Sequence, residues 1–254
     1  MAGNSAGGRG VKSDETLFAI IEAVREADGI GVTELAANVN LAKSSVHKHL
    51  STMRDHGFVV KRNGEYHLGL EFFSYGQYTR TTQDVYSAAL PALEEIASET
   101  GESTWLMTHE NGQVMYLDGR DPNDEINVNA LVGSWEEMHA NSGGKVILAH
   151  LRESEVNEIV ERHGLSAKTD ETITDRATLE EELERVRERG YALNLGEGLR
   201  EMNAVAVPLI SQESVEGALS VAGPTYRVKR ERCEGELLDR LRAAADDIGL
   251  SLAY

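Results

Sequence analysis

The sequence of 254 residues predicts an α+β fold in two parts. Helical periodicity dominates the first 57 residues, and an Asn-Gly pair, Asn63-Gly64, then separates two short β-rich runs. From residue 103 onward, strand-like runs alternate with charged helical segments, and a second such pair is Asn111-Gly112. Strands in sequential hairpins with helices beside them indicate a mixed, largely antiparallel sheet.

Two helices are expected before residue 41. The first has Ser13 at its start and ends before Gly29. The second is short, with Thr33 as its N-cap and Asn40 as a left-handed stop. The apolar residues that face inward from the two helices are Leu17, Ile20, Ile21, Val24, Leu35, Ala36 and Val39.

A third helix is expected within residues 41–57, LAKSSVHKHLSTMRDHG. Val46, Leu50 and Met53 recur at the spacing of one buried stripe. The opposite face is rich in hydrogen-bond donors and consists of Lys43, Ser44, Ser45, His47, Lys48, Ser51 and Arg54. We therefore expect this face to be exposed to solvent.

The Asn63-Gly64 pair predicts a hairpin with a type I′ turn, since that turn needs two residues with positive φ. Lys61, Arg62 and Asn63 would lie at its tip. Three helices followed by a hairpin form a winged helix-turn-helix, in which the third helix enters the major groove of DNA. The alternative is a buried helical hairpin with an incidental basic face.

The charge of the chain is unevenly distributed. The formal net charge is −18, yet residues 1–68 hold eight basic and eight acidic residues. Within residues 41–62 there are five basic residues and one acid, as a local nucleic-acid footprint would have, although chance clustering gives the same count. The acid excess, with only seven lysines in the chain, suggests a protein kept soluble in concentrated salt, as in a halophilic archaeon.

Beyond the hairpin, residues 71–101 read as one or two helices ending at Gly101. Phe72, Phe73 and Tyr75 could belong to a core or to a contact between domains or subunits; we interpret the segment 69–83 as a linker helix. Further strands are expected in INVNALVG (126–133), YALNL, NAVAVPLI and VEGALSVAG. Charged helices are expected at SEVNEIVERHG, at TDRATLEEELERVRERG with Thr174 as cap, and in one helix from 228 to the C-terminus.

Other chemistries have weak support in the sequence. One cysteine, Cys233, excludes an internal disulfide, and its charged helix predicts a surface or half-buried thiol. His109, Asp118 and His139 could be drawn together as a metal or acid/base set, but they lack the spacing of a metal-binding motif. With neither an apolar N-terminal segment nor a run long enough to span a membrane, we expect a cytoplasmic protein without cofactor or metal.

Four blocks of sequence together resemble the IclR-type (isocitrate lyase regulator-like) transcriptional regulators, over residues 12–250. The blocks are VTELAANVNLAKSSVHKHLSTMRDHGFV with GEYHLGL, MHANSGGKVILAHL, TITDRATLEEELERVRERGYALN, and NAVAVPL with ALSVAGP. The first residues are rich in Gly, Ser and Asn and predict a flexible tail (1–11). The resemblance implies a DNA-binding winged helix-turn-helix (12–68), a linker helix (69–83) and a GAF-like effector-binding domain (84–254). It also implies a homodimer or a dimer of dimers.

The resemblance assigns DNA-binding positions to Lys43, Ser44, Ser45, His47 and Lys48 in the third helix. Of these, we expect Ser44, Ser45 and His47 to read base edges, and the two lysines to contact phosphate or guanine. Arg62 and Asn63 would serve the wing.

The resemblance also implies a cavity that binds a small effector. Residues from three of the four blocks would line it. The candidate effector-binding residues are Asn141, Ser142, Gly143, Gly144, Asn194, Arg200, Asn203, Ala204, Ser220 and Ala222. Free N–H groups at the Gly143-Gly144 step would favour an anionic oxygen. Ala140, Ala204, Asn194 and Ala222 depart from the family pattern, so we expect a ligand other than the short keto acids.

Arg200, with Glu197 and Asn203, could supply the polar contacts that these departures remove, and an arginine would suit a carboxylate. Alternatively, Arg200 is a surface salt-bridge partner.

The whole pattern predicts a ligand-responsive, sequence-specific regulator of a catabolic pathway, without enzymatic activity. From family habit we expect a sugar, a sugar acid or another small carboxylate as effector. The alternatives are a regulator of aromatic-acid catabolism, a DNA-binding protein without ligand, and a metal-dependent enzyme with a fused DNA-binding domain.

Overall fold

The computed structural model describes residues 10–212 and 214–252, so most of the predicted tail (1–11) lies outside the described residues. The chain divides into two compact units, Met1–Arg80 and Thr81–Tyr254. The predicted linker helix therefore contains the division, and we describe each unit by itself.

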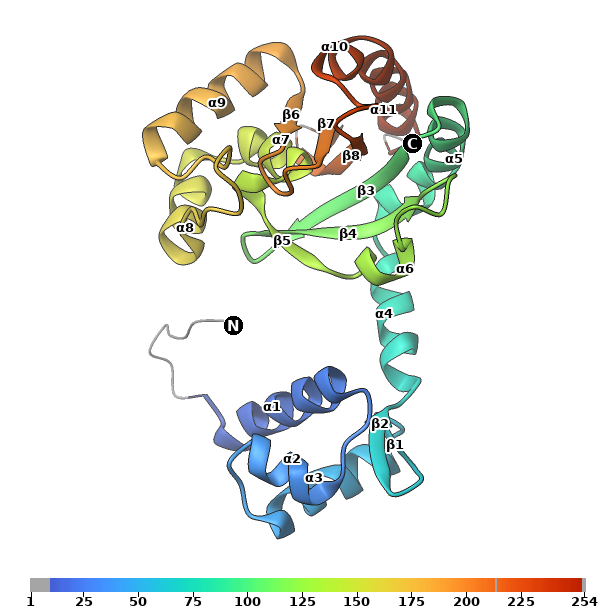
Figure 1. Cartoon of the computed structure of the whole chain (residues 1–254), viewed down its shortest axis with the longest axis vertical. Coiled ribbons are helices and arrows are strands. Elements are labelled where there is room, and N and C mark those ends of the chain that lie inside the picture. The colour runs from blue at the N-terminus through green and yellow to red at the C-terminus, as the bar shows by residue number, and fades with distance from the viewer. Residues whose placement is uncertain (1–9, 213, 253–254) are drawn as a thin grey trace. The chain divides into compact units, whose positions relative to one another are not determined.

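The first unit has the predicted order of three helices and a hairpin (Figure 1). Its elements are α1 (Lys12–Ala27), α2 (Val32–Asn38), α3 (Lys43–Asp55), β1 (Val59–Arg62), β2 (Glu65–Leu68) and α4 (Glu71–Thr81). Asn63 and Gly64 both have positive φ, 51° and 96°, and Asn40 is left-handed at 51°, so these sequence predictions are confirmed. The winged helix-turn-helix is confirmed with them.

The predicted start of the second helix is wrong by two residues. Helix α2 begins at Val32 with Gly31 as its N-cap, and Thr33 lies in its first turn. The backbone explains the difference, because the first intrahelical bond runs from Leu35 N–H to Gly31 O (2.9 Å) and needs no side-chain cap.

One apolar core holds the first unit together. Val46, Leu50 and Met53 of α3 are buried in it as predicted. The turn before α2 joins the wing through an antiparallel bridge between Ile30 and Tyr66. The position of α3 is thus fixed from its apolar side alone, which leaves its polar side uncovered within the unit.

The second unit contains one six-stranded sheet with helices on both faces. Its elements are α5 (Asp84–Thr100), β3 (Ser103–Glu110), β4 (Gln113–Arg120), α6 (Val128–Leu131), β5 (Trp135–Glu137), a 3₁₀ turn (Met138–Ala140), α7 (Ser142–His150), α8 (Glu153–His163), α9 (Arg176–Arg189), β6 (Ala192–Leu195), β7 (Met202–Ser211), β8 (Ser214–Pro224), α10 (Arg230–Arg232), a π turn (Cys233–Leu237) and α11 (Leu238–Leu252). The strand order is β5-β4-β3-β8-β7-β6. Every strand pair in the described sheet is antiparallel, so the expected mixed character is not seen there.

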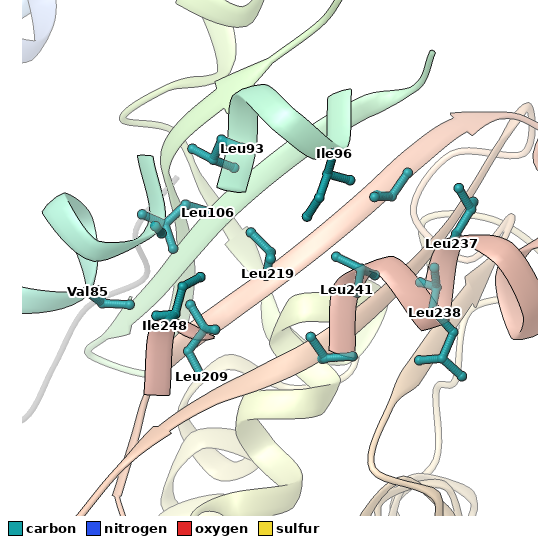
Figure 2. Packing of buried hydrophobic residues seen from close by; sticks show 14 of the residues in the cluster. Val85, Leu93, Ile96, Leu106, Leu209, Leu219, Leu237, Leu238, Leu241 and Ile248 are labelled. Carbon is teal, nitrogen blue, oxygen red and sulfur yellow. The ribbon is translucent and has the colours of Figure 1, made fainter. Parts of the chain in front are cut away.

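Strand alternation places two cores on opposite faces of this sheet. Leu106 and Leu219 pack with α5 and α11, as Figure 2 shows. The neighbouring residues Trp105, Met107 and Ala218 point the other way and pack with α7 and α9. The face toward α7 is the one that bears the cavity described below.

Three sequence predictions in the second unit are wrong. Residues 128–131 form a helix and not a strand, because the Asn127 side chain accepts from Ala130 N–H and caps it. Helix α9 is capped by Asp175 and not by Thr174. The terminal helix is interrupted at Gly235, whose φ of −111° and ψ of −110° are not helical.

Candidate functional sites

Most of the polar face of α3 is exposed within the first unit, but Ser51, which was also expected to be exposed, is half-buried. Lys43, Ser44, Ser45, His47 and Lys48 are all exposed, as predicted. Among the described residues, none of these side chains has a hydrogen-bond or ion-pair partner. The first turn contains no acidic residue. This face therefore presents two cations and several neutral donors and acceptors that the unit itself does not use.

The wing extends the same chemistry. Arg62 and Asn63 are exposed at its tip, where Asn63 begins the tight turn. Lys61 lies over the ring of Tyr66, with its ammonium nitrogen 5.2 Å from the ring centroid. Exposed cations on a helix and on a neighbouring hairpin suit a polyanion better than a small ligand, since neither element encloses a cavity.

A cavity of about 300 Å³ lies in the second unit, between the sheet and the first residues of α7. Seven of the ten candidate effector-binding residues line it: Asn141, Ser142, Asn194, Asn203, Ala204, Ser220 and Ala222. The cavity is at the lower end of the range of ligand pockets, roughly 300–1,000 Å³. It suits a small molecule.

Three candidates do not line the cavity. Arg200 has a side chain that is 61% exposed and forms an ion pair with Asp170 (2.6 Å), in agreement with the alternative interpretation as a surface salt-bridge partner. Gly144 donates its N–H to Asn141 Oδ1 (3.2 Å), so this N–H is not free for an anion. A Cβ on Gly144 would lie 2.4 Å from Met138 O, and one on Gly143 2.4 Å from Met107 Sδ. The two glycines are therefore needed for close packing of α7.

Sequence reasoning missed nine residues of the cavity wall. They are Trp105, Met107, Tyr116, Ile126, Leu131, Glu136, Gly198, Leu199 and Met202. The alternation of TWLMTH contained part of this signal, because it places Trp105 and Met107 on one face of a strand. Glu136 could not be found in this way, since its edge strand β5 has only three residues.

Three polar side chains form a network on one wall of the cavity. Asn141 donates through Nδ2 to Glu136 Oε2 (2.9 Å) and to the Tyr116 hydroxyl (3.1 Å). The Tyr116 hydroxyl donates to Glu136 Oε2 (3.4 Å). Burial, and then the charge of Glu136, raise the pKa of Tyr116 above its usual value, so this phenol stays protonated.

The other hydroxyl and amide side chains that line the cavity are also engaged. Ser220 donates to Val205 O (3.0 Å), so Ser142 is the donor in the contact between the two serine hydroxyls (3.2 Å). Asn194 donates to Ala140 O (2.8 Å), and Asn203 donates to Val228 O (2.8 Å). These side chains fix the wall as well as lining it.

Beside the cavity, a buried ion pair ties α7 to the loop that follows β6. Lys145 is 1% exposed, and its Nζ lies 2.6 Å and 2.7 Å from the two carboxylate oxygens of Glu197. Burial raises the pKa of Glu197, and the charge of Lys145 opposes that shift. Thr172 donates to Glu197 O (2.6 Å) and holds the same loop, which supplies Gly198 and Leu199 to the cavity wall.

Two of the three residues considered for enzymatic chemistry, His139 and Asp118, are engaged in structural contacts. His139 is buried and its Nε2 lies 3.1 Å from Ser166 O, while Asp118 pairs with Arg120 (2.9 Å). Within residues 10–212 and 214–252, no group of three or more His, Cys, Asp or Glu side chains could hold a metal ion.

Cys233 is fully buried, which corrects the expected surface or half-buried thiol. Its side chain belongs to the core under α11, and this burial raises its pKa to about 11. None of the helices described is both long enough and apolar enough to span a bilayer.

Comparisons with known proteins agree on one family. The family model of the IclR helix-turn-helix domain matches residues 16–63. The family model of the C-terminal domain of the bacterial transcriptional regulator IclR matches residues 77–250. The HTH-type transcriptional regulator KdgR of Escherichia coli is 30% identical over 96% of this chain and 94% of its own length.

Solved structures show the same relationship. The IclR of Thermotoga maritima has a TM-score of 0.78 and 27% identity, covering 96% of this chain and 98% of that one. The inducer-binding domain of PobR from Acinetobacter, as a double mutant with 3-hydroxybenzoic acid, has a TM-score of 0.60 and 28% identity over 64% of this chain and 95% of that one. The chain belongs to the IclR family of transcriptional regulators, and it is not an enzyme.

Proposed function

We propose that this IclR-family regulator binds a specific operator through α3 and the wing, and that a small effector in the cavity of the second unit changes that binding. One observation carries the proposal: the exposed polar face of α3 has no partner among the described residues, while a cavity lies in the other unit. A helix face without internal partners is available to DNA, and a cavity in the other unit is available to a small effector.

We assign separate roles to the residues of α3 and the wing. Lys43 and Lys48 contact phosphate or guanine, because a compact cation binds either through charge. Ser44, Ser45 and His47 read base edges. Arg62 and Asn63 contact the backbone or the minor groove from the wing.

We propose that the protein acts as a homodimer or a dimer of dimers. Large apolar side chains are exposed in and just before two helices. They are Val11 and Phe18 at α1, and Leu70, Phe73 and Tyr78 at α4. Leu70 alone is 83% exposed. Large apolar residues exposed in this number favour a protein interface, which a second copy of this chain would cover.

The family resemblance favours a sugar or a sugar acid as the effector. The regulated genes would then serve a catabolic pathway. A second candidate is an aromatic acid, which the aromatic wall residues Trp105 and Tyr116 favour, as does the 3-hydroxybenzoic acid bound to the PobR domain. In either case the effector shifts the population of arrangements in which two winged helices fit successive major grooves.

The site of action would be the cytoplasm, and the acid excess supports an origin in a halophilic archaeon. Phosphate contacts weaken steeply with salt, so operator binding must be tested in the salt of the cell.

Footprinting on the organism's own promoters tests the DNA-binding part of the proposal. Lys48→Ala should weaken binding to all sequences and reduce the slope of log K against log salt by about 1. Ser45→Ala should relax specificity at one base pair, with a cost of about 1–3 kcal/mol against the preferred sequence. Uniform loss from both variants would contradict the assigned roles, and a promoter set without protected sites would contradict the function.

Thermal unfolding with a panel of small acids and sugars tests the effector part. A ligand that binds only the native state raises the melting temperature, whereas a DNA-binding protein without ligand would show no shift.

A further inference from the structure

The cavity of the second unit has one carboxylate in its wall. Glu136 is the only charged side chain among the described residues that line it. Two basic residues near this region are engaged elsewhere, since Lys145 pairs with Glu197 and Arg200 with Asp170. The wall therefore presents a carboxylate to its ligand without a cation beside it.

The hydrogen bonds of Glu136 leave half of its carboxylate available. Oε2 accepts from Asn141 and from the Tyr116 hydroxyl. No described residue donates to Oε1. An ionised carboxylate can accept about four hydrogen bonds, so this group favours a ligand that brings donors.

The remaining donors of the wall are few and uncharged. Both amide hydrogens of Asn141 are used, by Glu136 and Tyr116, and the hydroxyl hydrogens of Ser142 and Ser220 are used in their own chain of bonds. Asn194 and Asn203 each keep one amide hydrogen, because each donates only once within the described structure. The indole N–H of Trp105 has no acceptor among the described residues.

The start of α7 is linked to a carboxylate of the protein itself. Asn141 accepts from Gly144 N–H at the N-terminus of the helix and donates to Glu136 Oε2. A ligand carboxylate placed there would lie in the same small cavity as Glu136, and two like charges in one site disfavour each other.

From these contacts we infer that the cavity selects a neutral polyhydroxyl compound, a sugar or polyol, and rejects the corresponding acid. The inference rests on the proposed function and decides between its candidate effectors. A hydroxyl group both donates and accepts, so it satisfies Glu136 and the neutral amide donors at once, whereas a carboxylate only accepts. The apolar face of a sugar ring matches the apolar part of the wall, Trp105, Met107 and Met202.

Matched pairs of a neutral compound and its acid test this inference on the full-length protein. The pairs are D-xylose with D-xylonate, D-galactose with D-galactonate, and benzyl alcohol with benzoate, with glycerol and xylitol added. Each compound is titrated to about 100 mM in thermal unfolding, because the rise in melting temperature follows ligand concentration over Kd. Potassium chloride keeps the ionic strength equal across the pairs.

For the wild type we expect at least one neutral polyol to raise the melting temperature, and its acid to bind roughly tenfold or more weakly. Glu136→Gln keeps an oxygen that can accept from Asn141 and Tyr116 but removes the charge. The acid should therefore bind to this variant roughly tenfold more tightly than to the wild type. Glu137→Gln is the matched control. Glu137 lies outside the cavity, where it accepts from Ser166 (3.1 Å) and pairs with Lys168 (3.5 Å), so this variant should keep the wild-type preference.

Three results would each overturn the inference: an acid that stabilises the wild type as much as its neutral partner, an unchanged preference in Glu136→Gln, or no stabilisation by any neutral polyol of the panel. Operator protection is measured on the same preparation. Protection together with tight binding of an acid would reject the inference alone, whereas loss of protection on every promoter would reject the proposed function.

Discussion

The two units use their polar side chains in opposite ways. On α3, Lys48 and its exposed neighbours have no side-chain partner among the described residues. Around the cavity, Asn141, Ser142 and Asn194 each hold another part of the same unit while they line the wall. Binding and stability are therefore separate properties in the first unit and shared properties in the second.

This difference has a direct consequence for mutation. Removal of an exposed side chain on α3 deletes a contact to a partner and leaves the fold intact. Removal of a side chain beside the cavity leaves a buried polar group without its partner, which costs more than the lost hydrogen bond itself. The following variants test this contrast in order of the expected effect.

Lys145→Met should have the largest effect. It leaves the Glu197 carboxylate buried without its counterion, which costs about 3–5 kcal/mol in the free energy of unfolding. Both tryptophans of the chain, Trp105 and Trp135, lie in the second unit, so denaturant unfolding followed by tryptophan fluorescence measures this unit. The double variant Lys145→Met/Glu197→Met should recover most of the loss, and a loss under 1 kcal/mol in the single variant would contradict the coupling.

The same variant should depend on pH in a defined direction. Burial raises the pKa of Glu197 above its ordinary value of 4.5, and loss of Lys145 removes the charge that opposes this shift. A raised pKa means that the folded state binds a proton that the unfolded state has released, so stability falls as pH rises through the folded pKa. We expect the deficit of Lys145→Met to be smallest near pH 4.5 and to grow toward neutral pH, as measured by unfolding across that range.

Gly144→Ala should have the next largest effect, because its Cβ would lie 2.4 Å from Met138 O and 2.5 Å from Met138 Cα. Overpacking against backbone costs about 1–3 kcal/mol and displaces the start of α7, so ligand binding should weaken together with stability. Gly76→Ala in α4 is the control, since no atom lies within 4 Å of its Cβ position. That change should be neutral or stabilising by up to about 1 kcal/mol.

Lys48→Ala should change the stability of the first unit by less than about 0.5 kcal/mol while it weakens operator binding. Hydrogen–deuterium exchange of the backbone amides in α1, α2 and α3 measures the first quantity and gel shift the second. A large loss of stability would show that this side of α3 supports the fold, and the contrast between the units would then fail.

The smallest effect concerns Cys233, which should not react in the folded protein. Its thiol is fully buried and its pKa is raised to about 11, so it remains protonated at pH 8. Labelling with a thiol reagent should therefore proceed only with unfolding of the second unit. Rapid labelling of the native protein would contradict the buried position.

The sequence predicted the first unit better than the cavity for a physical reason. In α3, the buried stripe of Val46, Leu50 and Met53 determines which residues face outward, so periodicity alone gives the exposed set. The cavity is built from several strands, and residues such as Glu136 and Trp105 meet there only through tertiary packing.

The sequence analysis also missed a helix cap. Asn127 caps a short helix in a stretch rich in β-branched residues, and this side-chain bond overrides their propensity for a strand. Arg200 is not among the residues that line the cavity, and the reason is different. Its guanidinium pairs with Asp170, which lies 30 residues away along the chain.

The double role of Asn141 gives the second unit a built-in reporter of occupancy. Its amide nitrogen donates to Glu136 and its carbonyl oxygen accepts from the backbone of Gly144. A molecule that competes for Glu136 disturbs the same side chain that protects this backbone amide from solvent. Hydrogen–deuterium exchange at Gly144 would then register filling of the cavity before any readout on DNA.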